Sequence, residues 1–285
     1  MGLSRREASA CWALSRHSLA TTTVWSQQRS TAWYVSTMIL TRALLCLTLV
    51  GCAAPSRFAR TGFEVHTFTH DATNVHLVVK DGAAFLFDTG YQKNAALLEA
   101  DVRAAGIDPK TLKAVIVSHG HADHAGAGLF FHQRFGVPVV IGEGDQGMYT
   151  SGQNEPLCPT GLIGNLRHRD DEAATYSASA PDVIVTDTLS LKELTGIDAQ
   201  VTRLPGHTGG SLVVTVGDVA LVGDLFRGSI VGAGAETHFY QCDLELNRRN
   251  VTRTLQQLAP NAQLFFTGHF GPVSREAVAE HFPPQ

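Results

Sequence analysis

Hydrophobic and polar positions divide the chain into blocks that predict strands and helices in a repeating order. Short runs rich in Val, Phe and Ala predict strands at residues 64–68, 75–80 and 84–87. Asp81-Gly82, between the second and third runs, is typical of a tight hairpin turn. An apolar spacing of i, i+4 and i+7 then predicts an amphipathic helix over residues 93–105. The patterned region therefore begins with three strands and one helix.

A similar order of strands, helix, strand and helix recurs farther along the chain. A buried strand is expected at 113–117, a helix at 125–135, a strand at 137–141 and a short helix at 143–150. More strands are expected at 183–186, 200–204, 211–216 and 219–222, then a helix with Asp243 as its N-cap, a strand at 264–266 and a terminal helix. Two similar halves packed face to face, with helices outside, predict an α+β fold, a four-layer αββα sandwich.

Residues 151–181 interrupt this order. They contain Gly, Pro, Asn and a charged patch at residues 167–172, with little periodicity. A connection this long inside a compact domain is usually functional or mobile. We therefore expect this segment to help select the substrate.

The composition is that of a globular protein. With 285 residues and 44% hydrophobic content, the chain can bury a hydrophobic core that is stable without disulfides or structural metal ions. The formal net charge is −4 and no basic cluster lies outside the N-terminal segment, which argues against a nucleic-acid partner. The expected partner is a small-molecule substrate.

The N-terminal segment has the features of a leader. It combines a short positive stretch, a short apolar run and the ending Leu-Val-Gly-Cys, which resembles a bacterial lipobox whose cysteine becomes lipidated. The predicted divisions are an upstream extension at residues 1–37, a lipoprotein signal peptide at 38–52 that ends at Cys52, a polar tether at 53–61 and the catalytic domain at 62–285.

This interpretation predicts export to the periplasmic side of the outer membrane, because Ala rather than Asp follows Cys52. The only membrane contact expected is the lipid anchor at Cys52. The Arg- and Ser-rich composition of residues 1–37 leaves an organellar transit peptide as the alternative. Cys158 and Cys242 remain in the predicted domain, either as a disulfide or as two buried thiols.

A dense group of possible metal ligands follows the expected strand at residues 113–117. The run from His119 to His124 reads His-Gly-His-Ala-Asp-His. A chain that turns as it leaves a strand can direct the first two His to one ion, and Asp123 and His124 to a neighbouring ion. The spacing therefore predicts two adjacent metal sites.

Three further ligand-type residues, His207, Asp224 and His269, each follow a short apolar strand and are flanked by Gly. With the first run they complete the order His-x-His-x-Asp-His, then His, Asp and His. Over residues 62–285 the chain thus resembles the metallo-β-lactamase superfamily, which is characterised by this order of ligand residues. The resemblance implies the metallo-β-lactamase fold and a metal-dependent hydrolase.

The resemblance also implies roles for the ligands. One metal would be held by His119, His121 and His207, the other by Asp123, His124 and His269, with Asp224 bridging the two. Two Zn²⁺ ions suit these ligands, and Fe or Mn can also occupy such sites. A hydroxide shared by the metals would attack a carbonyl carbon, while Asp123 would orient it and pass a proton to the leaving group.

Three residues outside the ligand set are further candidates. Asp88 matches a family position that orients ligands by hydrogen bonds, and the alternative is a turn-capping role. His238 and Tyr240 lie in the Gly-rich segment after Asp224 and could line the substrate pocket, although aromatic residues more often pack than bind.

The expected function is hydrolysis of a small ester, thioester, lactone or amide. A true β-lactamase of the third subclass is one alternative, because the run from His119 to Gly126 closely resembles theirs, although those enzymes lack a bridging Asp. An iron-dependent persulfide dioxygenase, an oxidoreductase that shares the first His pair and the Asp, is another. A non-catalytic metal-binding lipoprotein would have lost ligands, and none is lost.

Overall fold

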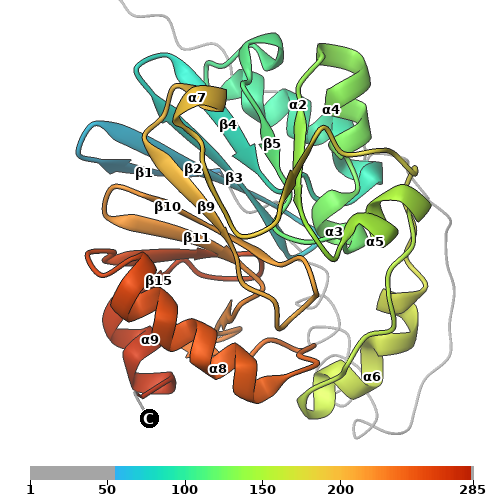
Figure 1. Cartoon of the computed structure of the whole chain (residues 1–285), viewed down its shortest axis with the longest axis vertical. Helices are drawn as coiled ribbons and strands as arrows, with labels where there is room; N and C mark the ends of the chain where they lie inside the picture. The colour runs from blue at the N-terminus through green and yellow to red at the C-terminus, as the bar shows by residue number, and fades with distance from the viewer. Residues whose placement is uncertain (1–54, 284–285) are drawn as a thin grey trace, which may run out of the picture. The chain divides into compact units, whose positions relative to one another are not determined.

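Two β-sheets lie face to face in the computed structural model, which describes residues 55–283, and helices cover their outer faces (Figure 1). The first sheet has the strand order β1-β2-β3-β4-β5-β6-β7, and the second has the order β15-β14-β11-β10-β9-β8. Strands β12 and β13 form a separate small sheet. This is the αββα sandwich of the metallo-β-lactamase fold, as the hydrophobic pattern and the resemblance predict.

The elements have the following bounds. The strands are β1 (Ser56–Arg60), β2 (Phe63–His70), β3 (Thr73–Lys80), β4 (Ala83–Phe87), β5 (Val115–Ile116), β6 (Val139–Gly142), β7 (Val183–Val185), β8 (Thr188–Ser190), β9 (Ala199–Arg203), β10 (Leu212–Val216), β11 (Val219–Gly223), β12 (Arg227–Gly228), β13 (Ala235–Glu236), β14 (Leu264–Thr267) and β15 (Val273–Ser274). The α-helices are α2 (Ala95–Ala104), α3 (Ala122–Ala125), α4 (Gly128–Phe135), α5 (Gln146–Ser151), α6 (Gly161–Glu172), α7 (Lys192–Thr195), α8 (Leu244–Arg253) and α9 (Arg275–His281). Short 3-10 turns at η2 (Gln92–Asn94) and η3 (Pro109–Thr111) and a π-helical turn at η4 (Thr254–Leu258) complete the set.

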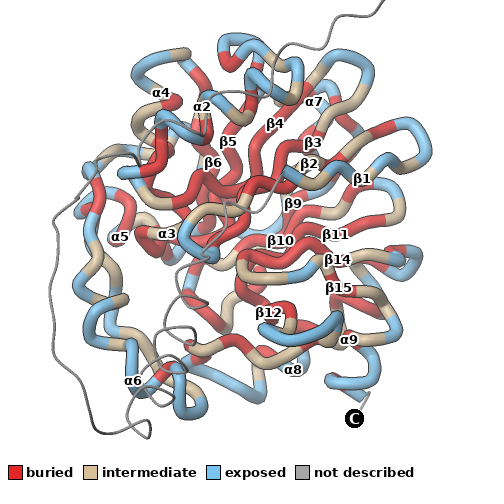
Figure 2. The backbone as a smooth tube through the Cα atoms, turned by 180° about the vertical axis from the view of Figure 1, so that it is seen from behind, coloured by how far each residue is buried: buried red, intermediate tan, exposed pale blue. Residues whose placement is uncertain are grey.

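The alternation of side chains along the strands explains the layers. Phe85 and Phe87 of β4 are fully buried between the two sheets, where they share a cluster with Val201 of β9. Leu86, which points the other way, packs with Leu98 of α2 on the outer face. Burying one such side chain contributes about 1.5–3 kcal/mol. Figure 2 shows the result as a buried centre of strands within more exposed helices and turns.

Several local predictions are confirmed. Asp81 and Gly82 both have positive φ, 50° and 81°, and join antiparallel β3 and β4 as the hairpin turn. Asp243 caps α8 by accepting a hydrogen bond from the Leu246 backbone N–H at 2.8 Å. These features depend on a few neighbouring residues, so the sequence alone suffices to predict them.

Two strand assignments are corrected. Residues 56–60, expected within the tether, form β1, which pairs antiparallel with β2. This edge strand alternates only between exposed and half-buried positions, so its pattern resembles a polar linker. The strand at 183–185, expected with the second set, is β7 and pairs parallel with β6 in the first sheet. Hydrophobicity shows that a strand is buried but does not identify its neighbour.

Two helices also differ from expectation. The segment 151–181 contains α6, whose only fully buried residue is Gly164. A helix without a buried apolar stripe has no periodic signal to detect. The predicted helix at 125–135 is two helices, α3 and α4, with a break at Gly126. This glycine packs against the backbone of Gln92 so closely that a side chain would not fit.

Cys158 and Cys242 form a disulfide with Cα atoms 4.9 Å apart, so the first of the two cysteine alternatives is correct. The bond joins the segment before α6 to the segment before α8, 84 residues apart in sequence. We expect replacement of both cysteines by serine to lower the free energy of unfolding by about 2–4 kcal/mol, because the unfolded chain gains loop entropy. Urea unfolding of the oxidised wild type against the double variant measures this, and equal midpoints would contradict it.

No helix among the described residues is long and apolar enough to cross a membrane. The predicted upstream extension, the lipoprotein signal peptide and Cys52 lie outside the described residues.

Candidate metal centre

The predicted ligands meet where strands of both sheets end. His119 to His124 follow β5 and enter α3, His207 follows β9, Asp224 follows β11 and His269 follows β14. Gly268 makes this approach possible, because a Cβ atom there would collide with Asp224 Oδ1 and with the His124 ring. The seven residues thus converge from four loops on one site.

The ligand atoms fall into two groups. In the first, His207 Nε2 lies 3.0 Å from His119 Nε2 and 3.1 Å from His121 Nδ1. In the second, His269 Nε2 lies 3.3 Å from His124 Nε2 and 3.3 Å from Asp123 Oδ2. Tetrahedral ligands at metal–nitrogen distances of about 2.0–2.1 Å lie about 3.3 Å apart, so both spacings fit a metal ion.

Asp224 lies between the two groups. Its Oδ2 atom is 3.5 Å from His207 Nε2 and 3.4 Å from His124 Nε2, while its buried Oδ1 atom has no hydrogen-bond partner. An unpaired buried carboxylate oxygen is costly unless a cation satisfies it. The donor set therefore fits a divalent metal, with Asp224 able to contact ions in both groups.

Hydrogen bonds fix the orientation of the imidazoles. His207 Nδ1 donates to the Tyr240 carbonyl at 2.6 Å, and His269 Nδ1 donates to the Ala72 carbonyl at 2.9 Å. Donation from Nδ1 leaves the Nε2 lone pair directed into the centre. His124 Nδ1 lies 2.9 Å from Asp88 Oδ2, and Asp88 Oδ1 accepts from the Ser118 backbone N–H at 2.6 Å.

Comparison with known proteins agrees with this geometry. The model of the metallo-beta-lactamase superfamily matches residues 68–269. The chain belongs to this superfamily. Its members are metal-dependent hydrolases, so the coarse activity follows from membership, while the substrate does not.

Two relatives and one solved structure are similar to this chain. The hydroxyacylglutathione hydrolase GloC of Haemophilus influenzae is 30% identical over 162 residues, which cover 50% of this chain and 71% of that protein. The probable metallo-hydrolase YflN of Bacillus subtilis is 29% identical over 57% of this chain and 66% of its own length. BJP-1, a subclass B3 metallo-beta-lactamase of Bradyrhizobium japonicum, shares 19% identity with a TM-score of 0.52 over 72% of this chain and 74% of its own, which shows the fold.

The electrostatic environment differs between the two ligand groups. Burial lowers the pKa of His119 well below 6.5 and that of His121 to about 3, so both rings are neutral at pH 7, as metal binding requires. Burial also disfavours the charged form of His269, but Asp224 and Asp123 outweigh it and raise the pKa of His269 to about 10. The carboxylate side therefore attracts positive charge, which a divalent ion would supply.

Asp145 is a buried residue that the sequence pattern did not single out. Its carboxylate accepts hydrogen bonds from the backbone N–H groups of Gly120 at 2.9 Å and Gly210 at 2.6 Å, and from the Thr208 hydroxyl at 2.7 Å. Gly120 separates His119 from His121, and Thr208 follows His207. Asp145 thus ties together the two loops that supply the first ligand group. Its position before α5 gives no chemical signal in the sequence.

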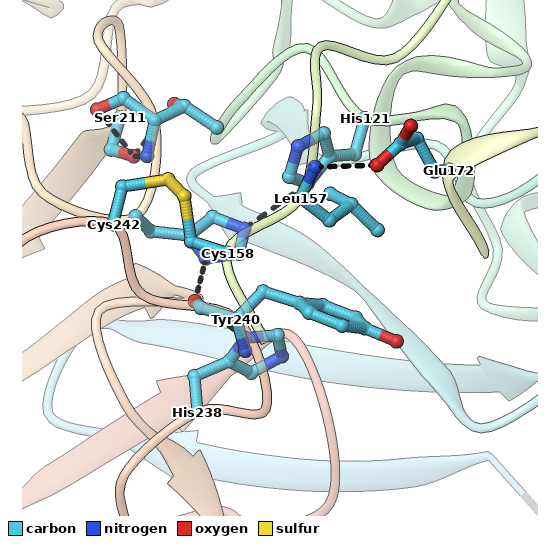
Figure 3. Close-up of a disulfide and its surroundings, with 10 residues drawn as sticks. His121, Leu157, Cys158, Glu172, Ser211, His238, Tyr240 and Cys242 are labelled. Carbon is cyan, nitrogen blue, oxygen red and sulfur yellow. Dashed lines mark hydrogen bonds between the residues drawn. A yellow bond between two sulfur atoms is a disulfide. The ribbon is translucent and has the colours of Figure 1, made fainter. Parts of the chain in front are cut away.

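His238 contacts the centre rather than only lining a pocket. Its ring is 2% exposed in the side chain, and Nε2 lies 3.1 Å from Asp224 Oδ2. The Tyr240 backbone N–H donates to His238 Nδ1 at 3.2 Å. The His238 Nε2 atom is buried without a hydrogen-bond partner among the described residues, and His207, Asp224 and His238 together place three ligand atoms close enough to hold a metal ion. Figure 3 shows His238 and Tyr240 beside the Cys158–Cys242 disulfide.

We expect His238→Ala to weaken metal binding about 10–100-fold, because the ring lies against Asp224 and forms with it and His207 a group that could hold a metal ion. Competition with a chromogenic chelator measures the affinity. His132→Ala, on α4 and outside the pocket, with its side chain 40% exposed, is the matched control. Unchanged affinity in His238→Ala would mean that this ring is only packed against the site.

A pocket opens over the centre. Residues of the second ligand group, Asp123 and His269, line it together with Asp224, His238 and Tyr240. His238 and Tyr240 both line this cavity, and α6 contributes a further wall; whether they contact a substrate stays a prediction.

Proposed function

We propose that the protein is a binuclear metal-dependent hydrolase that acts on a small ester, thioester, lactone or amide. The observation that carries this proposal is the position of Asp224, whose Oδ2 atom lies 3.5 Å from both His207 Nε2 and His269 Nε2. One carboxylate thereby faces both ligand groups at the floor of the pocket.

His119, His121 and His207 would hold one ion, and Asp123, His124 and His269 the other. Two divalent ions, most simply Zn²⁺ with Fe or Mn as alternatives, would lower the pKa of water to about 7 and polarise a carbonyl oxygen. Asp88 holds His124 in place through its hydrogen bond. Asp123 lines the pocket, where its carboxylate would take a proton from the attacking water and deliver it to the leaving group.

The proposal is tested on the full chain. Metal content is measured first, followed by rates on nitrocefin, aryl esters, lactones and glutathione thioesters with and without a chelator. We expect two divalent metal ions per chain, and chelator-sensitive hydrolysis of acyl substrates other than nitrocefin. Dominant nitrocefin cleavage would favour a β-lactamase, and one iron per chain with oxygen consumption would overturn the hydrolytic proposal.

We also propose that the protein is exported and anchored by lipid at Cys52, on the lipobox-like ending Leu-Val-Gly-Cys. Mass spectrometry of the mature N-terminus tests this. An unmodified Cys52 within a longer chain would contradict it.

A further inference from the structure

One part of the wall of the pocket over the metal centre is apolar. The apolar and aromatic residues that line it are Tyr91, Leu157, Ile163, Ile230, Phe239 and Phe270. The cavity has a volume of about 170 Å³, below the roughly 300–1,000 Å³ of pockets for drug-sized ligands. It therefore fits a small ligand with an apolar group.

The apolar wall reaches the surface at two places. Ile163 on α6 is 40% exposed, and Ile230, in the loop between β12 and β13, is 51% exposed. Both line the pocket, so part of each side chain faces the ligand and part faces solvent. An apolar chain longer than the cavity could extend along these two side chains.

The cation that lines this pocket is already paired. Arg167 of α6 donates to Asp171 from Nε at 3.2 Å and from Nη2 at 3.0 Å. The Tyr240 hydroxyl also donates to Asp171, so this carboxylate is bonded both within α6 and to the segment that carries His238. The pair has no net charge, and although the Arg167 side chain is 64% exposed, the neighbouring carboxylate reduces the attraction of Arg167 for an anion.

Asp71, the remaining charged residue of the pocket outside the proposed metal ligands, also has a partner. Asp71 lies 2.9 Å from Lys93 Nζ and accepts a hydrogen bond from Asn94 at 2.8 Å. Among the described residues that line the pocket, none offers a cation without a carboxylate partner. Apart from the proposed metal ions, a carboxylate on a substrate would thus meet only cations that already have a carboxylate partner.

We propose that the substrate is an uncharged ester or lactone whose acyl chain is apolar. This inference rests on the proposed hydrolytic function and narrows it, because glutathione thioesters and β-lactam antibiotics carry carboxylates. Hydrolysis breaks the acyl carbon–oxygen bond, joins the oxygen of water to the carbonyl carbon and transfers a proton of that water to the leaving alkoxide. The acyl chain would lie against Ile163 and Ile230, away from the paired charges.

The test compares two substrates of nearly equal shape on the metal-loaded full chain. These are para-nitrophenyl pentanoate and the para-nitrophenyl monoester of glutaric acid, which ends in a carboxylate. We expect kcat/KM to be at least about tenfold higher for the uncharged ester, because a desolvated charge without a partner is costly. Ligand-observed NMR compares binding of a neutral methyl ketone with that of the keto acid of the same chain, and requires no turnover.

A charge-changing variant tests whether the preference for the uncharged ester arises in the pocket. Asp171→Asn frees Arg167, and we expect it to reduce the ratio of the two kcat/KM values by about fivefold or more. Asp170→Asn makes the same change at an exposed neighbouring position of α6 and should leave the ratio unchanged.

Failure of this inference is distinguishable from failure of the proposed function. Chelator-sensitive hydrolysis with equal rates, or with a preference for the charged ester, would overturn the substrate class and leave the hydrolase proposal standing. Absence of hydrolysis with every ester and lactone, together with tighter binding of the ketone than of the keto acid, would overturn the hydrolase proposal while the pocket selectivity stood.

Discussion

Replacement of Asp224 by alanine is expected to reduce chelator-sensitive hydrolysis by about a thousandfold and to leave less than one bound metal ion per chain. Asp224 Oδ2 faces His207 of the first ligand group and His124 of the second, so its loss weakens both groups at once. Metal ions supply several kcal/mol of transition-state stabilisation, and about 4 kcal/mol corresponds to a factor of about a thousand. Metal analysis after gel filtration and steady-state rates measure the two effects.

Asp198→Ala provides the matched control for this experiment. Asp198 is exposed in the turn before β9, so its removal should change neither metal content nor rate. Full activity and full metal content in Asp224→Ala would mean that Asp224 is not a ligand. One ion per chain in the wild type, unchanged in the variant, would instead support a mononuclear site.

Replacement of Asp145 by alanine is expected to lower the free energy of unfolding by about 4 kcal/mol and to weaken metal binding. Three hydrogen bonds to a buried carboxylate are lost, and the donors on Gly120, Thr208 and Gly210 remain buried. The loops that carry His119, His121 and His207 then lose their common anchor. For a domain of this size, the melting temperature should fall by roughly 8–16 °C.

Thermal unfolding with and without a chelator separates the two effects. Asp145→Asn keeps the side-chain shape and should lie between wild type and alanine, which keeps the prediction testable if the alanine variant does not fold. Glu143→Ala, at an exposed position two residues away, should change the stability by less than about 1 kcal/mol. A melting temperature of Asp145→Ala equal to that of Glu143→Ala would contradict the prediction.

The metal ligands of the candidate site were easier to predict from the sequence than the contacts that support them. The seven ligand-type residues stand out because His and Asp at strand ends, next to Gly, have few structural explanations. Asp145 and the contact between His238 and Asp224 were not predicted. Their roles depend on loops far apart in the sequence, such as residues 120 and 210, that only folding brings together.

The sequence by itself determined the local features of this protein. Alternation along β4 placed Phe85 and Phe87 on one face and Leu86 on the other, and Asp81-Gly82 and Asp243 fixed a turn and a helix start. The tertiary structure decided which strand joined which sheet, that the two cysteines paired, and that α6 lines the pocket with an arginine paired to Asp171. The reason is that periodicity and capping act within a few residues, whereas strand pairing, the disulfide and the pocket charges depend on contacts between distant segments.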